Sequence, residues 1–172
     1  MRKIKILLLA FIAFISSTSS HAEHVRVTNP NALSVEMFGM GFLYGLRFDR
    51  VLNDDLVAGI GMGSVPLKYK DTDEDSNKSA LLAPVYASYY FMRNGNSPFV
   101  LVGASLVTNS SDTKNMSAKL GGIELNSSPI IGMAGLGYES RSDAGFLFRL
   151  TGYLMAAKSL IPWFGFSFGY AF

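Results

Sequence analysis

Hydrophobic and polar or small residues alternate along most of the chain with a period of two. In 79–91, for example, Leu81, Val85 and Tyr89 fall on one face, while Tyr86 and Ser88 fall on the other. This alternation is typical of β-strands, because successive side chains point to opposite sides. The alternating runs are separated by turn-rich pieces, and together they predict eight strands, at roughly 33–39, 42–51, 56–68, 79–91, 98–108, 129–139, 146–156 and 162–172.

The connections between these strands alternate in length. If the strands run up and down, the short turns at 53–55, 92–97 and 140–145 fall at the end that carries both termini. The longer polar connections, 69–78 and 109–128, then fall at the opposite end. The pattern predicts an all-β protein whose fold is an eight-stranded antiparallel up-and-down barrel.

The first hairpin is the critical step in this count. Residues 33–51 have to form two strands and a tip within nineteen residues, whereas a tilted membrane-spanning strand needs about 9–11 residues. If 33–51 formed one long strand, the barrel would have seven strands and the termini would lie at opposite ends.

The N-terminal segment has the layout of a secretory signal peptide. Arg2, Lys3 and Lys5 precede an apolar run over 6–15, and a serine-rich stretch ends in Ser20-His21-Ala22. The apolar run is too short for a spanning helix. We therefore expect 1–22 to be a cleaved signal peptide, 23–32 to be an N-terminal periplasmic tail, and 33–172 to be the barrel.

Removal of 1–22 changes the charge of the chain. The full chain of 172 residues has 15 Lys and Arg against 13 Asp and Glu, a formal charge of +2. The 150 residues that remain lose three of those basic residues and carry −1. No basic patch is left to favour a nucleic-acid partner, and the lack of cysteine excludes disulfides and thiol chemistry.

The faces of the strands distinguish a membrane barrel from a soluble, lipocalin-like barrel. A soluble barrel needs a charged outer face, but the segments 56–67, 79–91, 98–108 and 129–138 contain no charged residue. A spanning sheet in lipid must close so that every backbone polar group is paired. The sequence therefore favours a transmembrane barrel, with aromatic girdles expected from Phe42, Tyr44, Tyr89, Phe91, Phe99 and Tyr138.

The chain ends in FGFSFGYAF, in which aromatic residues occupy every second position from Phe164 to Phe172. This ending resembles the last strand of bacterial outer-membrane proteins, which closes on a phenylalanine with an aromatic residue two before it. In that family the barrel-assembly machinery recognises the pattern, and the resemblance assigns this role to Phe168, Tyr170 and Phe172. Ser167 stands where the family often has glycine.

The rest of the chain resembles the small eight-stranded barrels of the OmpA/OmpX type, in the outer membrane protein beta-barrel domain family. The opening segment SVEMFGMGFLYGLRFDRVL is similar to the first hairpin of such proteins. The resemblance implies a monomer in the outer membrane of a Gram-negative bacterium, in contact with lipid and lipopolysaccharide and inserted by the assembly machinery.

A few charged residues fall on the lumen face of the predicted strands, where an unpaired charge costs several kcal/mol. We predict a lumen charge network of Glu36, Arg47, Asp49 and Arg149, with Glu139 as a further candidate member. The network is interpreted as a structural plug, with a gate or polar path as the alternative. Arg50 falls on the lipid face at a strand end, from which its side chain can reach the interface.

Three classes of function are compatible with this fold. The favoured one is a structural or surface-interaction role through the outer loops 69–78 and 109–128. The second is a carrier or narrow pore for small hydrophobic molecules, with Pro84 and Pro129 as weak points for a lateral opening because each lacks a backbone donor.

The third class, an enzyme that modifies envelope lipid, is disfavoured. The lipid A deacylases and the palmitoyl transferase with barrels of this size use a histidine, and His24 is the one histidine after the signal peptide. The acidic run 71–75 is similar to the start of a calcium loop, but Ser76 and Leu82 stand where that loop needs glycine at position six and glutamate at position twelve. No catalytic residue, cofactor or metal site is therefore predicted.

Overall fold

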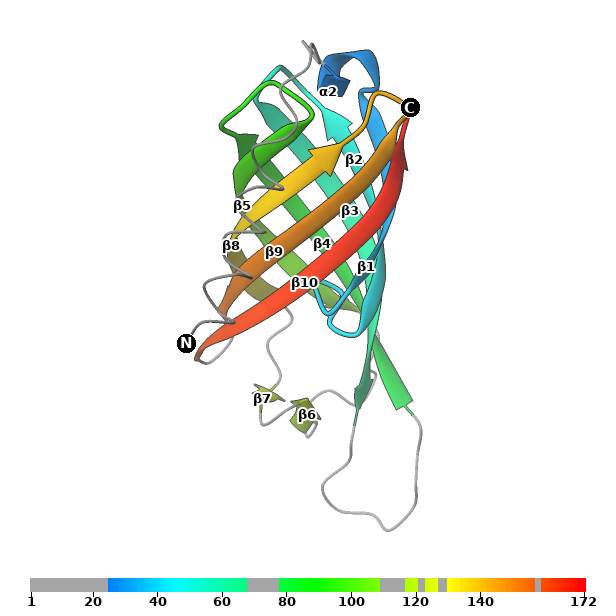
Figure 1. The fold of residues 1–172 in the computed structure, drawn as a ribbon. Helices are drawn as coiled ribbons and strands as arrows, with labels where there is room; N and C mark the ends of the chain where they lie inside the picture. The colour runs from blue at the N-terminus through cyan, green and yellow to red at the C-terminus, as the bar shows by residue number, and fades with distance from the viewer. Residues whose placement is uncertain (1–24, 68–77, 109–116, 121–122, 127–129, 157–158) are drawn as a thin grey trace, which may run out of the picture.

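The structure is a computed structural model, and it describes residues 25–67, 78–108, 117–120, 123–126, 130–156 and 159–172. Eight antiparallel strands form a closed barrel in the order β1-β10-β9-β8-β5-β4-β3-β2 (Figure 1). A short helix and a separate two-stranded hairpin complete the described residues. The elements are α2 (Val25–Thr28), β1 (Asn31–Met37), β2 (Tyr44–Val51), β3 (Leu56–Leu67), β4 (Lys78–Tyr90), β5 (Asn96–Thr108), β6 (Ser117–Leu120), β7 (Ile123–Asn126), β8 (Ile130–Arg141), β9 (Phe146–Ala156) and β10 (Leu160–Ala171).

The eight-stranded antiparallel up-and-down barrel predicted from the sequence is confirmed. Residues 33–51 do form two strands, β1 and β2, which pair with each other in register from Asn31↔Arg50 to Met37↔Tyr44. Strand β1 also pairs with β10, which closes the barrel. The bounds of the eight barrel strands differ from the predicted ones by at most two residues at any end. The hairpin of β6 and β7 lies in a segment that the sequence predicts to be a loop.

The two ends of the barrel differ, as the lengths of the connections predicted. Helix α2 and the C-terminus lie at one end, which we call the terminal end (Figure 1). The short turns β2–β3, β4–β5 and β8–β9 lie at this end too, because β1 starts from it and the strands then alternate in direction. The tip of 38–43 lies at the opposite end, the loop end, where β3, β5 and β9 end and where β4, β8 and β10 begin.

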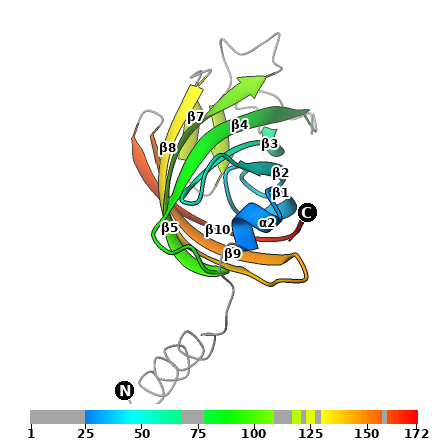
Figure 2. The same ribbon diagram turned by 90° about the horizontal axis from the view of Figure 1, so that it is seen from above.

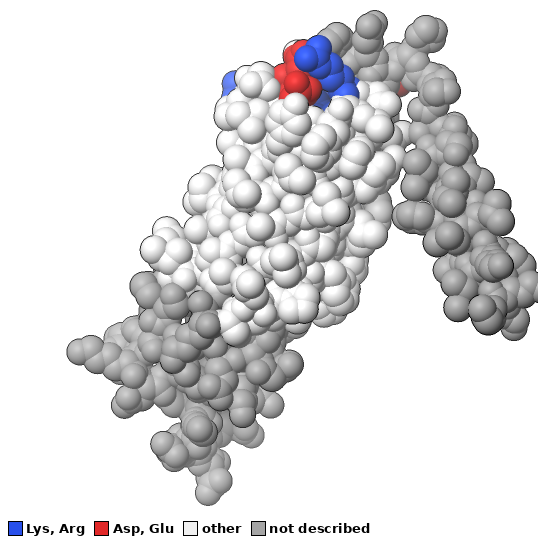
Figure 3. Space-filling model, turned by 90° about the vertical axis from the view of Figure 1, so that its left-hand side faces the viewer, with Lys and Arg blue, Asp and Glu red and all other residues white. Residues whose placement is uncertain are grey.

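The outer wall of the barrel is apolar. Leucine, valine, methionine and aromatic side chains point outward from all eight strands, and Leu136, near the middle of β8, is 64% exposed. In the face shown in Figure 3, charged side chains gather at the terminal end and the wall is free of them. Arg50 is exposed at that end of β2, where its guanidinium donates to the Asn31 side chain at 2.8 Å. Within the described residues, no helix is both long and apolar enough to cross a membrane.

The tip between β1 and β2 folds into the lumen at the loop end. Met40 and Phe42 are buried there, and Phe42 adopts a positive φ of 65°. The close approach of the tip requires glycine on the wall behind it. A Cβ on Gly63 would lie 2.3 Å from the Cα of Gly41, and one on Gly165 would lie 2.5 Å from the Cα of Gly39. The tip therefore fills the loop end of the lumen.

Helix α2 covers the terminal end of the lumen (Figure 2). This single-turn helix buries Val25 and Arg26 and leaves Val27 exposed. The backbone then enters β1 at Asn31, whose N–H donates to the carbonyl of Phe172 at 3.0 Å. The predicted tail of 23–32 thus contains an element that packs into the barrel, while 23–24 and the predicted signal peptide lie outside the described residues.

Candidate functional site

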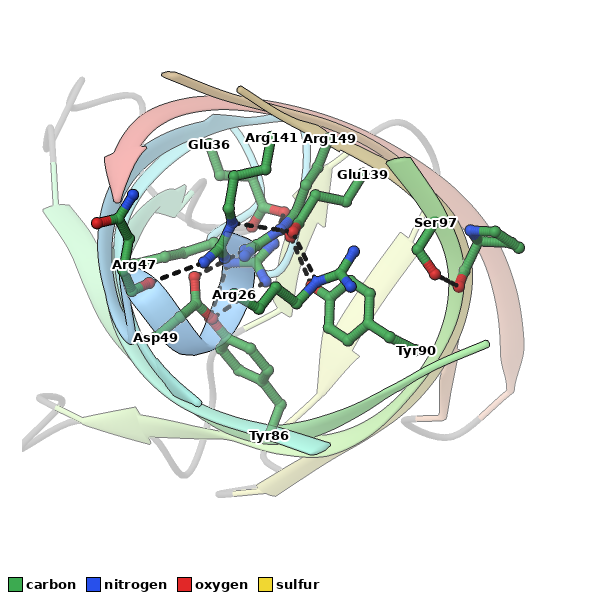
Figure 4. Close-up of polar contacts among 12 residues, drawn as sticks. Arg26, Glu36, Arg47, Asp49, Tyr86, Tyr90, Ser97, Glu139, Arg141 and Arg149 are labelled. Atoms are coloured by element: carbon green, nitrogen blue, oxygen red, sulfur yellow. Dashed lines mark hydrogen bonds and ion pairs between the residues drawn. The ribbon is translucent and has the colours of Figure 1, made fainter. Parts of the chain in front are cut away.

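Seven charged side chains are buried inside the barrel among the described residues, and Figure 4 shows them converging in the lumen. Each is at most 4% exposed. They come from α2 and from four strands, β1, β2, β8 and β9, which lie next to one another or are joined by β10 around the wall. The members are Arg26, Glu36, Arg47, Asp49, Glu139, Arg141 and Arg149, and we call this set the lumen network.

The network begins at the tip in the loop end. Glu36 accepts a hydrogen bond from the backbone N–H of Met40 at 2.8 Å, so this carboxylate holds the tip inside the barrel. Its other oxygen accepts from Arg47 at 2.8 Å, and Arg47 lies 3.9 Å from Asp49. These contacts link β1 to β2 on the inward face of the first hairpin.

The second half of the network reaches the terminal end. Arg149 donates to Asp49 at 2.7 Å and to Glu139 at 2.5 Å. Arg26 of α2 then donates to Glu139 at 3.2 Å and to the carbonyl of Met92 in the β4–β5 turn at 2.7 Å. Burial lowers the pKa of Arg26, and the attraction of Glu139 opposes this effect. One continuous set of contacts therefore joins the tip of 38–43 at the loop end to α2 at the terminal end.

Three tyrosines complete the hydrogen bonding of the carboxylates. Tyr86 donates to Asp49 at 2.5 Å, Tyr90 donates to Glu139 at 2.6 Å, and Tyr153 donates to Glu36 at 2.7 Å. Two of the rings also lie under guanidinium groups, with Arg26 4.0 Å from the centre of Tyr90 and Arg47 4.6 Å from that of Tyr86. Every buried carboxylate thus accepts from at least one arginine and from one phenol.

The structure brings together all four residues that the sequence singled out, Glu36, Arg47, Asp49 and Arg149, together with Glu139. Sequence reasoning missed Arg26 and Arg141. Arg26 precedes every strand and Arg141 was placed in a turn, so neither carried a face assignment from the period-two pattern. The tyrosine partners were visible only as one face of a strand, and nothing in a single sequence shows which carboxylate each one meets.

Two residues expected in the aromatic girdles point inward instead, so that expectation was wrong for them. Phe42 belongs to the tip, and the tip folds into the lumen. Phe99 lies on the inward face of β5, where its ring is 5.1 Å from that of Tyr90 and fills the space above Gly137. Tyr44, Tyr89 and Phe91 are exposed on the outer surface, as expected of girdle residues.

The weak point predicted at Pro84 coincides with a break in the pairing of β3 with β4. Register pairs run from Leu56↔Tyr89 to Ile60↔Val85 and resume at Gly63↔Leu82. Pro84 lies opposite the gap and has no N–H to donate. On the lumen side of the gap the buried Pro84 ring packs beside Gly61, where a Cβ would lie 3.0 Å from it. Pro129 lies outside the described residues.

The other features predicted from the sequence lie partly within the described residues. Phe168, Tyr170 and Phe172 of the C-terminal strand are exposed on the outer surface, each more than half. In the part of the chain that the structure describes, no three histidine, cysteine or acidic side chains are grouped to hold a metal ion. The acidic run 71–75 and His24 lie outside the described residues, as does most of the predicted outer loops 69–78 and 109–128.

Comparison with known proteins supports the fold assignment. No family model matches the chain, and no curated protein matches it. Among solved structures, the N-terminal β-barrel domain of Pseudomonas aeruginosa OprF is similar, with a TM-score of 0.54 and 18% sequence identity. The match covers 83% of this chain and 95% of that domain. At this identity the likeness is one of fold: the chain folds as an eight-stranded barrel of the OprF kind.

Proposed function

We propose that this chain is an integral barrel of the bacterial outer membrane, in which a closed lumen supports a structural or surface-interaction role of the outer loops. The observation that carries the proposal is the inverted distribution of polarity. Charged groups such as Glu139 and Arg149 are buried inside the barrel, while leucine, valine and aromatic residues cover its outside. Such a wall is unfavourable in water and suits lipid.

The likeness to OprF supports the same proposal at the level of fold. A closed antiparallel barrel pairs the backbone groups of neighbouring strands with one another, which the hydrocarbon region requires, and here the register is interrupted at the short gap between β3 and β4. A soluble lipid-binding barrel of the lipocalin kind would need the opposite arrangement, with apolar side chains around a cavity and charged ones outside. The exposed aromatic pairs Phe146–Tyr170 and Tyr89–Phe91, near the terminal end, fit one of the two interfacial girdles.

The filled lumen favours a structural role over a pore or carrier. The tip of 38–43 occupies the loop end, α2 covers the terminal end, and the lumen network spans the space between. An enzymatic role finds no support in the same geometry, because each buried carboxylate already accepts from an arginine and a tyrosine. A general base needs a carboxylate that is free to take a proton from a substrate.

Cell fractionation with and without heating tests the location. A closed membrane barrel resists detergent until it is boiled, so we expect the protein in the outer-membrane fraction with an electrophoretic mobility that changes on heating. Leu136→Arg places a charge near the middle of the lipid-facing wall and should reduce the folded band strongly, whereas Leu52→Arg in the β2–β3 turn should leave it unchanged. Recovery of folded protein in the soluble periplasmic fraction would overturn the proposal.

Labelling of single cysteines on intact cells tests the surface role, since the chain contains no cysteine of its own. Ser159 is exposed at the loop end and Asp143 is exposed at the terminal end. We expect a membrane-impermeant maleimide to label Ser159→Cys on intact cells and Asp143→Cys only after the cells are opened. The reverse pattern would turn the outer loops toward the periplasm and exclude a cell-surface role.

A further inference from the structure

The lumen network has unequal numbers of basic and acidic side chains. Among the described residues, four buried arginines (Arg26, Arg47, Arg141 and Arg149) face three buried carboxylates (Glu36, Asp49 and Glu139). The tyrosines do not supply the missing negative charge, because Tyr86, Tyr90 and Tyr153 all act as donors to carboxylates and are therefore neutral phenols. An uncompensated positive charge inside a barrel is costly.

The imbalance is concentrated around Glu139. Arg26 and Arg141 each place Nε 3.2 Å from one oxygen of this carboxylate, and Arg149 places Nε 2.5 Å from the other. Within the residues that the structure describes, Arg149 is the one of these three arginines that has a second carboxylate partner, Asp49. Arg141 donates a hydrogen bond from Nη1 to the backbone carbonyl of Asn29 at 3.1 Å. Three guanidinium groups therefore converge on a carboxylate that neutralises only one of them.

Each of the same three arginines carries a buried hydrogen-bond donor without a partner, as do some other side chains of the lumen, among them Ser34, Ser105 and Trp163. The Nη2 atom is buried and has no hydrogen-bond partner in Arg26, in Arg141 and in Arg149. In a guanidinium, Nη2 lies on the same edge as Nε, so each of these donors points toward the region around Glu139. The hydroxyl of Ser167, which is the register partner of Arg149 on β10, is also buried without a partner.

We infer that the terminal end of the lumen binds one small inorganic anion of the halide class, held by Arg26, Arg141 and Arg149 beside Glu139. A halide accepts several N–H and O–H donors at once and adds the one negative charge that equalises the network. A water molecule can accept these donors but leaves the charge uncompensated. Because Arg26 belongs to α2 while the other two belong to β8 and β9, the anion also ties the helix to the wall.

Anion-dependent stability of the purified folded barrel tests the site. The temperature at which the unheated electrophoretic band is lost is measured in chloride and in methanesulfonate, a much larger anion of the same charge, at constant ionic strength. A ligand that binds only the folded state stabilises it in proportion to the logarithm of its concentration above the dissociation constant. We expect each tenfold increase in chloride to raise the midpoint by about 3–6 °C.

The matched variants are Arg26→Gln, which removes one unused donor and the excess charge, and Arg93→Gln, which removes an exposed arginine at the same end. Arg26→Gln should abolish the chloride effect and Arg93→Gln should keep it. Equal midpoints of the wild type in chloride and methanesulfonate would overturn the inference.

Crystals of the wild type grown in bromide give a second readout that needs no variant. The expected result is one anomalous peak within hydrogen-bond distance of Arg26, Arg141 and Arg149. Bromide found only on the outside of the barrel would contradict the site. Both measurements are made in detergent, so their outcome is independent of the cellular location proposed above.

Discussion

At the scale of single residues, each buried carboxylate of the lumen network is stabilised by several partners at once. No carboxylate of the lumen network depends on one partner, and Glu139 alone is contacted by Arg26, Arg141, Arg149 and Tyr90. A buried ion pair often contributes little net stability against an apolar replacement, but removal of one partner leaves an uncompensated charge. The network is therefore most sensitive where one group serves several others.

We expect Glu139→Gln to destabilise the barrel by about 3–5 kcal/mol, because it strands the arginines that surround this carboxylate. The measurement is urea unfolding in lipid vesicles, followed by loss of the heat-sensitive band. Asp54→Asn is the matched control, since Asp54 forms an exposed ion pair with Arg93 and its loss should change the free energy of unfolding by less than about 0.5 kcal/mol. Equal effects of the two substitutions would show that Glu139 is not a centre of the network.

At the scale of elements, the two short pieces outside the regular wall close the lumen. The tip of 38–43 is anchored by Glu36, and α2 is anchored by Arg26. Period-two alternation located the strands well, because every strand separates an apolar outer face from an inner one. The alternation did not locate the tip, because an aromatic residue such as Phe42 fits a membrane girdle as well as the lumen. It did not locate α2 either, because this helix is a single turn long.

The fit of the tip against the wall makes a specific prediction for glycine. Gly63→Ala would bring its Cβ within 2.3 Å of the Gly41 backbone, so the tip has to move out of the lumen or the wall has to shift. The expected result is a lower unfolding midpoint, with 38–43 becoming accessible to protease added from the loop end. Gly152→Ala is the control, because its Cβ would meet only the Leu136 carbonyl, at 3.8 Å. A Gly63→Ala barrel as stable and as resistant as the control would mean that the tip does not pack as described.

At the scale of the whole molecule, the barrel has an apolar outside and a polar, filled inside. The strand count, the closure and the charge-bearing faces were predictable from the sequence, since lumen positions of β1, β2 and β9 follow directly from alternation. The meeting of Glu139 and Arg149 with Arg26 of α2 could not be predicted from the sequence, because it depends on the stagger of the strands around the barrel. Phe99 shows the same limit, since an aromatic residue in an apolar strand fits either face.

The closed lumen predicts that the protein conducts no ions. In planar lipid bilayers, wild-type protein should give no steady unit conductance under conditions in which a general porin does. The physical reason is that the tip, the lumen network and α2 fill the axis of the barrel from one end to the other. A reproducible unit conductance carried by the purified protein would refute the structural-plug interpretation in favour of a pore.

The most direct test of the account asks which surface of the barrel meets lipid. The chain has one tryptophan, Trp163, which packs against Phe42 in the lumen core. In vesicles of brominated lipid, Trp163→Phe/Leu136→Trp should lose most of its fluorescence, because Leu136 lies on the apolar outer wall. Trp163→Phe/Leu52→Trp, with its indole in the β2–β3 turn, should lose little. Equal quenching of the two, or none in either, would show that the apolar wall does not face lipid and would contradict the membrane barrel.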